Sequence, residues 1–232
     1  LIDRVSGTLG LVLLLITAAG ALFAGGVISV FAAGFVYHGE VEKVALATDM
    51  LRLTFPYLLF ISLTAFAGSI LNSFGRFGAP AFTPVLLNLT LIGCAVWLRP
   101  YLDVPIMALA WGVLLAGLLQ LLFLMPFLRA AGLLPVPKVD FRDSGVKRIL
   151  WLMVPGIFGV SVGQINLLLD TVLASFLETG SLSWLYYSDR LLELPLALFG
   201  ITIATVILPS LSREHSGDSP TAFSATLDWA IR

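Results

Sequence analysis

Charged residues and cysteine are both scarce in this sequence, and each scarcity excludes a class of protein. Charged residues make up 12% of the 232 residues, whereas hydrophobic residues make up 59% and the mean hydropathy is +1.01. A soluble domain carries about 25% charged residues, so the composition excludes an ordinary soluble protein. The net charge of −1 and the absence of a basic stripe also argue against a nucleic-acid partner.

The single cysteine, Cys94, lies inside an apolar run. An intrachain disulfide is therefore impossible, a metal site built from thiols is excluded, and we expect a small core residue. The two histidines, His38 and His215, lie in separate polar connections, and no HExxH, GxSxG or P-loop spacing occurs. We therefore expect neither enzymatic activity, nor a metal site, nor a cofactor.

Long apolar runs are abundant instead. At about 1.5 Å per residue, a helix needs roughly 20 residues to cross a hydrocarbon core about 30 Å thick. The sequence predicts an all-α fold, a polytopic membrane bundle of about six transmembrane helices. The runs cover residues 9–33, 46–74, 81–98, 106–128, 149–177 and 194–211.

Proline and small residues mark details within these runs. Pro56 predicts a kink in the second run, and Pro84 predicts an early break in the third. Small residues gather in the first run, and the fourth carries Ala108, Gly112 and Ala116 at every fourth position, a pattern typical of close helix packing.

The connection 129–148 is the longest and most basic, and it is the natural boundary between two bundles. Asp143 or Ser144 is expected to cap the helix that follows. Six crossings divide most of the Lys and Arg residues into eight on one side and two on the other, and the richer side is expected to be cytoplasmic. The eight are Arg4, Arg76, Arg129, Lys138, Arg142, Lys147, Arg148 and Arg213; the two are Lys43 and Arg99.

An aromatic and charged segment, residues 181–193, precedes the last apolar run. Trp184, Tyr186 and Tyr187 suit a membrane interface, and Asp189 and Arg190 follow at once. One interpretation is that these charges mark the helix end and reach into lipid headgroups. The other is that Arg190 faces the bundle interior and binds an anionic ligand, because charges within a membrane usually line a pathway.

The fifth run is unusually polar, with Gln164, Asn166 and Asp170, which predicts a face toward protein or water. Asp170 and Arg190 lie equally far in sequence from the turn at Gly180, so they are expected at similar depth. They could form an ion pair or line an aqueous cavity. Arg52 in the second run is weaker evidence for a cavity, because Asp49 is close enough along the helix to neutralise it.

Several stretches, in this order, resemble the MurJ (MviN) family of lipid II flippases in the MOP exporter superfamily. The resemblance runs over almost the whole chain, and the Trp-x-Tyr-Tyr-x-Asp-Arg-Leu segment is particular to this family. The stretches are LTFPY with the following ISLTAFAGSILNSFGRFGAPAFTPVLLN, then ALAWGVLLAGLLQL, then VSVGQINLLLDTVLASFLETGSLSWLYYSDRLLELP with its closing ILPSLS.

The resemblance implies a MOP/MATE-like fold of fourteen helices in two lobes around a central cationic cavity. Residues 1–137 would be part of the N-lobe, with four transmembrane helices. Residues 138–232 would begin the C-lobe, with two more and the start of the next. Arg190 matches a cavity arginine that the family requires, Asp189 accompanies it, and Arg52 matches a basic position. With Gln164, Asn166 and Asp170, these are the candidate substrate-binding residues.

The implied function is flipping of lipid II, an undecaprenyl-diphosphate-linked muropeptide, across the bacterial cytoplasmic membrane by alternating access. The implied partners are lipid II, membrane lipids and the cell-wall synthesis machinery. An exporter of another polyprenyl-linked glycan and a non-transporting membrane scaffold are the alternatives. The chain opens at Leu1 without a methionine and stops within an expected helix, so we expect an internal piece of a longer polypeptide.

Overall fold

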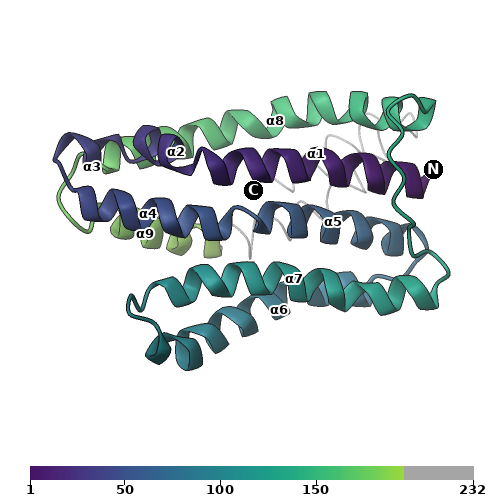
Figure 1. The fold of residues 1–232 in the computed structure, drawn as a ribbon, viewed down its shortest axis with the longest axis horizontal. Helices are drawn as coiled ribbons and strands as arrows, with labels where there is room; N and C mark the ends of the chain where they lie inside the picture. The colour runs from purple at the N-terminus through teal and green to yellow at the C-terminus, as the bar shows by residue number, and fades with distance from the viewer. Residues whose placement is uncertain (196–232) are drawn as a thin grey trace, which may run out of the picture. The chain divides into compact units, whose positions relative to one another are not determined.

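The computed structural model describes residues 1–195, and all of the regular structure in that range is helical (Figure 1). This confirms the all-α prediction. The chain forms two compact units, residues 1–176 and 177–232. The first holds α1 (Ile2–Leu22), α2 (Ala24–Phe31), α3 (Ala33–Tyr37), α4 (Val41–Thr54), α5 (Tyr57–Ser73), α6 (Gly78–Gly93), α7 (Met107–Ala130) and α8 (Ser144–Ala174), and the second holds α9 (Ser181–Pro195).

Within residues 1–195, five helical stretches are long and apolar enough to cross a membrane. They confirm a polytopic membrane bundle. The sixth predicted transmembrane helix, over the apolar run 194–211, lies outside the described residues apart from its first two positions. The five stretches are Ile2–Leu22, Val41–Ser73, Gly78–Tyr101, Met107–Ala130 and Ser144–Ala174.

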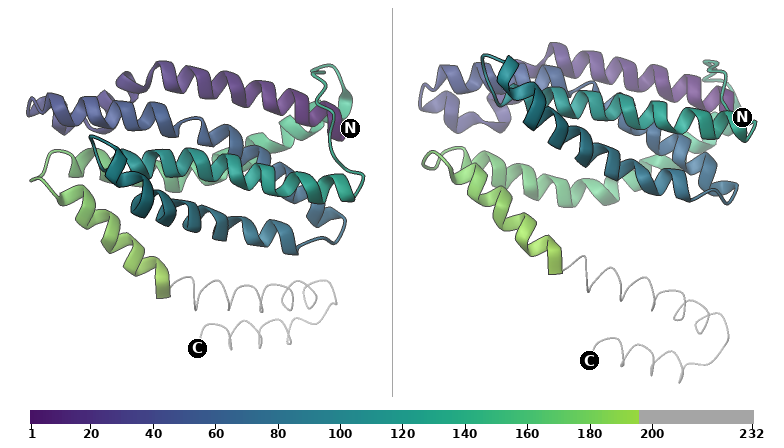
Figure 2. Two further views of the ribbon diagram at one scale, coloured as in Figure 1. Left: turned by 60° about the horizontal axis from the view of Figure 1, so that its bottom comes forward. Right: turned by 90° about the horizontal axis from the view of Figure 1, so that it is seen from below.

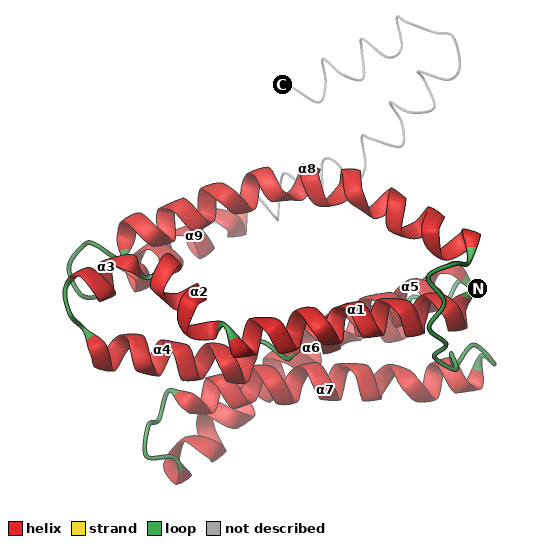
Figure 3. Cartoon of the chain, turned by 45° about the horizontal axis from the view of Figure 1, so that its top comes forward, coloured by secondary structure: helices red, strands yellow, loops and turns green. Residues whose placement is uncertain are grey.

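The first apolar run, residues 9–33, supplies a membrane-spanning helix but is not helical without interruption. The helix starts earlier, at Ile2, and the chain then breaks at Phe23 and again at Ala32, where φ is −117° and ψ is 42°. Gly25 and Gly26 follow the first break and weaken helix formation there. The second break redirects the chain into α3, which packs against the end of α8 (Figure 3).

The kink at Pro56 is confirmed, because α4 ends and α5 begins on either side of it. The break at Pro84 is wrong, since α6 continues through this residue. Pro84 has no N–H to donate to the carbonyl oxygen of Pro80. The Thr83 hydroxyl donates to that oxygen instead, at 2.9 Å, and so replaces the missing bond. The helix changes character only later, in a π-helical turn at Cys94–Leu98 and a 3-10 turn at Arg99–Tyr101.

The small-residue stripe of α7 packs as predicted. Ala108 and Ala116 are buried, and a Cβ on Gly112 would lie 3.3 Å from the Cβ of Cys94. Cys94 is therefore the small core residue that was expected. Toward the other end of α7, a core of Ala67, Ile70, Leu71, Leu124 and Leu128 joins α5 to α7.

The connection after α7 is tied to the start of α1 (Figure 2). The backbone N–H of Lys138 donates to the Asp3 carbonyl oxygen at 2.8 Å, and that of Asp140 donates to the Thr8 hydroxyl at 3.1 Å. Asp143 caps α8 by accepting the N–H groups of Gly145 and Val146. Of the two expected caps, Asp143 is thus the one that acts. The lobe boundary near Pro137 stays a prediction.

Candidate functional site

Three candidate site residues lie on α8, whose central part is open. From Trp151 to Asp170 every residue is exposed within the described part of the chain, except Ser161, which is half-buried. Asn166 and Asp170 are four residues apart and share one face of the helix, whereas Gln164 lies about 160° around the helix from Asn166. The structure therefore brings Asn166 and Asp170 together and places Gln164 on nearly the opposite face.

Glycines extend the face of Asn166 and Asp170 toward the start of α8. At Gly156, Gly159 and Gly163, no atom of the described residues lies within 4 Å of the place where a Cβ would be. This face combines small residues with an amide and a carboxylate, and the first unit leaves it uncovered.

Arg190 lies on α9 with its side chain 61% exposed. Its Nη1 donates to Glu193 Oε2 at 2.7 Å, and its guanidinium lies 5.3 Å from the centre of the Tyr186 ring. A guanidinium carries five N–H donors, so these contacts leave donors for a ligand. The neighbouring Asp189 is half-buried.

The predicted pairing of Asp170 with Arg190 joins residues of the two separate units and stays a prediction. Within α9, the carboxylate that balances Arg190 is Glu193, which sequence reasoning did not assign to it. The spacing of three residues is the signal that could have found this pair.

Arg52 lies on α4, which packs on α1, α2, α3 and α7. Its Nη1 donates to Asp49 Oδ1 at 3.4 Å, as expected from their spacing, and both side chains are more than half exposed. An exposed pair of this kind contributes little to stability. Arg52 therefore remains available as a cation.

Gln120 is a buried polar residue that sequence reasoning passed over. Its side chain is 2% exposed in the middle of α7, and Nε2 donates to the Thr83 carbonyl oxygen on α6 at 2.8 Å. The signal was a lone amide in a long apolar run. The bond ties α6 to α7, which is a packing role.

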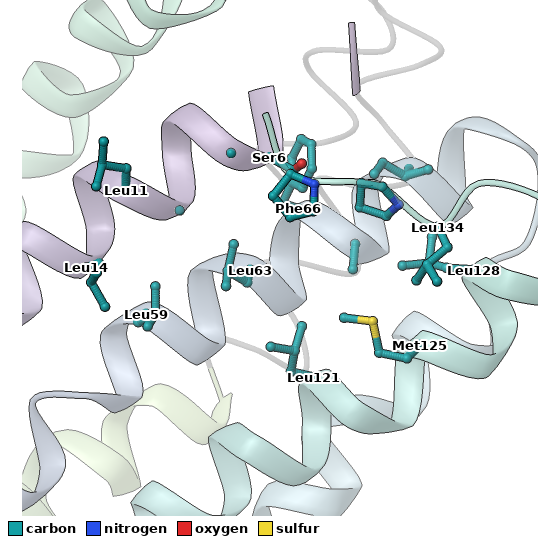
Figure 4. Close-up of a pocket in the computed structure, with 16 residues that line it drawn as sticks. Ser6, Leu11, Leu14, Leu59, Leu63, Phe66, Leu121, Met125, Leu128 and Leu134 are labelled. Atoms are coloured by element: carbon teal, nitrogen blue, oxygen red, sulfur yellow. The ribbon is translucent and has the colours of Figure 1, made fainter. Parts of the chain in front are cut away.

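Two cavities lie within the first unit, and none of the six candidate residues lines either of them. The larger, about 580 Å³, lies between α1, α5, α7 and the connection that follows α7. Figure 4 shows Leu11 and Leu14 on one wall with Leu59 and Leu63 on another. The smaller, about 380 Å³, lies between α1, α5 and α8. Such apolar linings suit hydrocarbon and not a diphosphate.

Metal ligands are not grouped in the part of the chain that the structure describes. No three histidine, cysteine, aspartate or glutamate side chains among residues 1–195 lie close enough to hold a metal ion.

Comparison with known proteins gives a consistent family. The profile of the family described as "Lipid II flippase MurJ" matches residues 1–232. A Vibrio cholerae protein described as "Probable lipid II flippase MurJ" is 52% identical over 237 residues, which cover 100% of this chain and 45% of that protein. "Lipid II flippase MurJ" of Burkholderia cenocepacia is 42% identical over 236 residues, which cover 100% of this chain and 45% of that protein.

A solved structure agrees with these relatives. "Lipid II flippase MurJ, inward closed conformation" superposes with a TM-score of 0.73 at 28% identity, covering 93% of this chain and 44% of that one. The chain thus spans about half the length of the relatives that it matches. With its several membrane-spanning helices, it is a multi-pass segment of the bacterial cytoplasmic membrane. The chain belongs to the MurJ family of lipid II flippases.

Proposed function

We propose that the protein moves lipid II, the undecaprenyl-diphosphate-linked precursor of peptidoglycan, across the cytoplasmic membrane by alternating access. The observation that carries the proposal is the family match over residues 1–232 together with 52% identity to a relative described by this activity. Transport leaves the substrate chemically unchanged, so no enzymatic step is proposed. Membrane lipids and the cell-wall synthesis machinery are the other proposed partners.

The proposed contact for the substrate diphosphate is Arg190. A polar headgroup crossing a low-dielectric layer needs fixed cations in a wet cavity. Arg190 is exposed, uses one donor on Glu193, and lies beside the interfacial aromatics Tyr186 and Tyr187. A guanidinium offers phosphate oxygens a planar fork of donors and keeps its charge in a site of low dielectric constant.

The remaining candidates are proposed to line the same water-filled path. Asp189 adjoins Arg190 on α9, Asn166 and Asp170 share the open face of α8, and Arg52 supplies a second cation. Gln164 lies on the other face of α8, so its contribution would come from a different side of the helix.

The test is substitution of Arg190 in the full-length protein, with flipping of lipid II measured in vesicles. One charge-assisted hydrogen bond is worth roughly 1.5 to 3 kcal/mol, about ten- to a hundredfold in affinity. Arg190→Ala should therefore abolish flipping while the protein still inserts, and Arg190→Lys should restore it in part. Arg99→Ala, which removes an exposed arginine of the α6–α7 connection, is the matched control and should flip at the parental rate.

Parental flipping by Arg190→Ala would leave Arg190 as a headgroup anchor. Loss of flipping in the Arg99→Ala control as well would mean that the assay responds to any lost cation and not to Arg190.

A further inference from the structure

The end of α8 is bound to α3 by neutral contacts within the first unit. The backbone N–H of Gly34 donates to Ser175 Oγ at 2.9 Å, and that hydroxyl in turn donates to the Val172 carbonyl oxygen at 2.6 Å. His38 Nε2 lies 3.3 Å from the carbonyl oxygen of Phe176. Ser175 is 1% exposed, so its hydroxyl is fully used and shielded from water.

Backbone lies against backbone at this contact. A Cβ on Gly34 would lie 2.0 Å from the carbonyl oxygen of Ser175 and 2.2 Å from its carbonyl carbon, so no larger residue fits without a shift of the chain. The break at Ala32 places Gly34 in this position. The two breaks in the first apolar run thus have a structural consequence: they bring a glycine to the end of α8.

The remainder of α8 is held differently. At its start, Asp143 caps the helix and pairs with Arg4, and Val146 is 2% exposed. Between the two ends the described residues leave α8 exposed, and Figure 3 shows it diverging from α1 over this stretch. A helix that is held at its two ends and exposed between them can release one end by local opening while the other end stays in place.

We propose that the α3–α8 contact of Gly34, His38, Ser175 and Phe176 is a latch that closes the outer end of the transport path. This proposal rests on the proposed function, and "outer" on the predicted orientation. When the latch is made, α8 stays on the first helices; when it releases, the end of α8 moves away and the open face of Asn166 and Asp170 becomes reachable from outside. Alternating access would then use the latch as its outer closure.

A distance between two spin labels tests the latch without any substrate. In full-length protein with Cys94→Ser, labels at Glu42→Cys on α4 and Leu173→Cys on α8 report how far the end of α8 lies from the bundle, and both positions are exposed. Gly34→Leu should populate a longer distance. Ser175→Ala, a much milder change, should raise that population roughly two- to tenfold, the range expected for one neutral hydrogen bond.

The control is Gly26→Ala, because no atom lies within 4 Å of a Cβ at that glycine of α2. It should keep the parental distance distribution. An unchanged distribution in both Gly34→Leu and Ser175→Ala would overturn the latch. The distance measurement uses no lipid II, so it is independent of the flipping assay. If Gly34→Leu lengthens the distance but the parental protein does not flip lipid II in vesicles, the proposed function is refuted and the latch stands.

Discussion

Asp143 joins two segments that are far apart in the sequence. Its carboxylate accepts the N–H groups of Val146 and Gly145 at the start of α8 and pairs with Arg4 of α1. The hydrogen bond from Val146, followed by that from Arg4, holds the pKa of Asp143 below its ordinary value. The ionised form is therefore the one that stabilises the fold.

The sign of the pH dependence follows from this lowered pKa. The stabilisation by Asp143 is fully present above the ordinary pKa of an aspartate, about 3.9, and is lost as the pH falls through the lowered folded value. Asp143→Asn keeps a capping side chain but removes the charge that pairs with Arg4, so it should lower the melting temperature of the full-length protein at pH 7 slightly and flatten its decline below about pH 4. Thermal unfolding in detergent at several pH values checks this. Asp103→Asn, at an exposed loop position, is the control, and an equal effect there would contradict the assignment.

Single residues were predictable from sequence where their partners are local. The cap by Asp143 and the Asp49–Arg52 pair follow from spacing along one helix. The bond of Gln120 to Thr83 does not, because its partner lies 37 residues away on another helix. Local geometry is set by the helix itself, whereas distant partners depend on packing.

Helix boundaries were likewise predictable where their cause is local in the sequence and not where it is distant. Run length predicted the membrane-spanning elements, and Pro56 predicted the kink between α4 and α5. The break at Ala32 was not predictable, since it accompanies the packing of Gly34 on Ser175, 141 residues further along. At Pro84 the sequence predicted a break that is not there. The helix continues because the Thr83 hydroxyl donates the hydrogen bond that proline cannot.

The packing of α7 against α5 is close enough at Gly117 that one added methyl group should destabilise the protein. A Cβ on Gly117 would lie 2.7 Å from Tyr57 Cδ2 and 3.0 Å from Phe60 Cβ, so α5 would have to move. Gly117→Ala should destabilise the full-length protein by about 1 to 3 kcal/mol, the usual cost of overpacking. Gly78→Ala, at an open position at the start of α6, should cost much less. Equal melting temperatures for the two variants would show that α5 and α7 tolerate the extra atom.

The candidate site residues stay a prediction from the sequence, and what closes the site around them could not be predicted from it. The polar residues of α8 and Arg190 of α9 stand out in the sequence because charges and amides are rare in apolar helices. The segments that would enclose these polar residues cannot be read from either unit alone, because the first unit leaves the centre of α8 exposed. The exposed centre of α8 is therefore the surface on which the proposed transport path would be completed.

The first unit gathers basic connections at one end, which bears on the orientation of the chain. Contacts between Asp3 and the connection after α7 place the start of α1 beside Lys138. The turn between α5 and α6, with Arg76, lies at the same end in Figures 1 and 2. The first turn of α4, with Lys43, and the turn after α6, with Arg99, lie at the other end. The structure thus groups these cations as the alternation of crossings predicted, and the positive-inside rule predicts that their end is cytoplasmic.

Cysteine labelling tests that orientation in intact cells. In a Cys94→Ser background, a cysteine at Ser144 should react only after the membrane is made permeable, because it lies at the start of α8, next to the basic connection expected inside. Cysteines at Asp103 and Thr179 should react with an impermeant maleimide added from outside. All three positions are exposed, so access to the reagent and not burial should decide the result. The opposite pattern would invert the topology, and with it the assignment of the Gly34–Ser175 contact to the outer end.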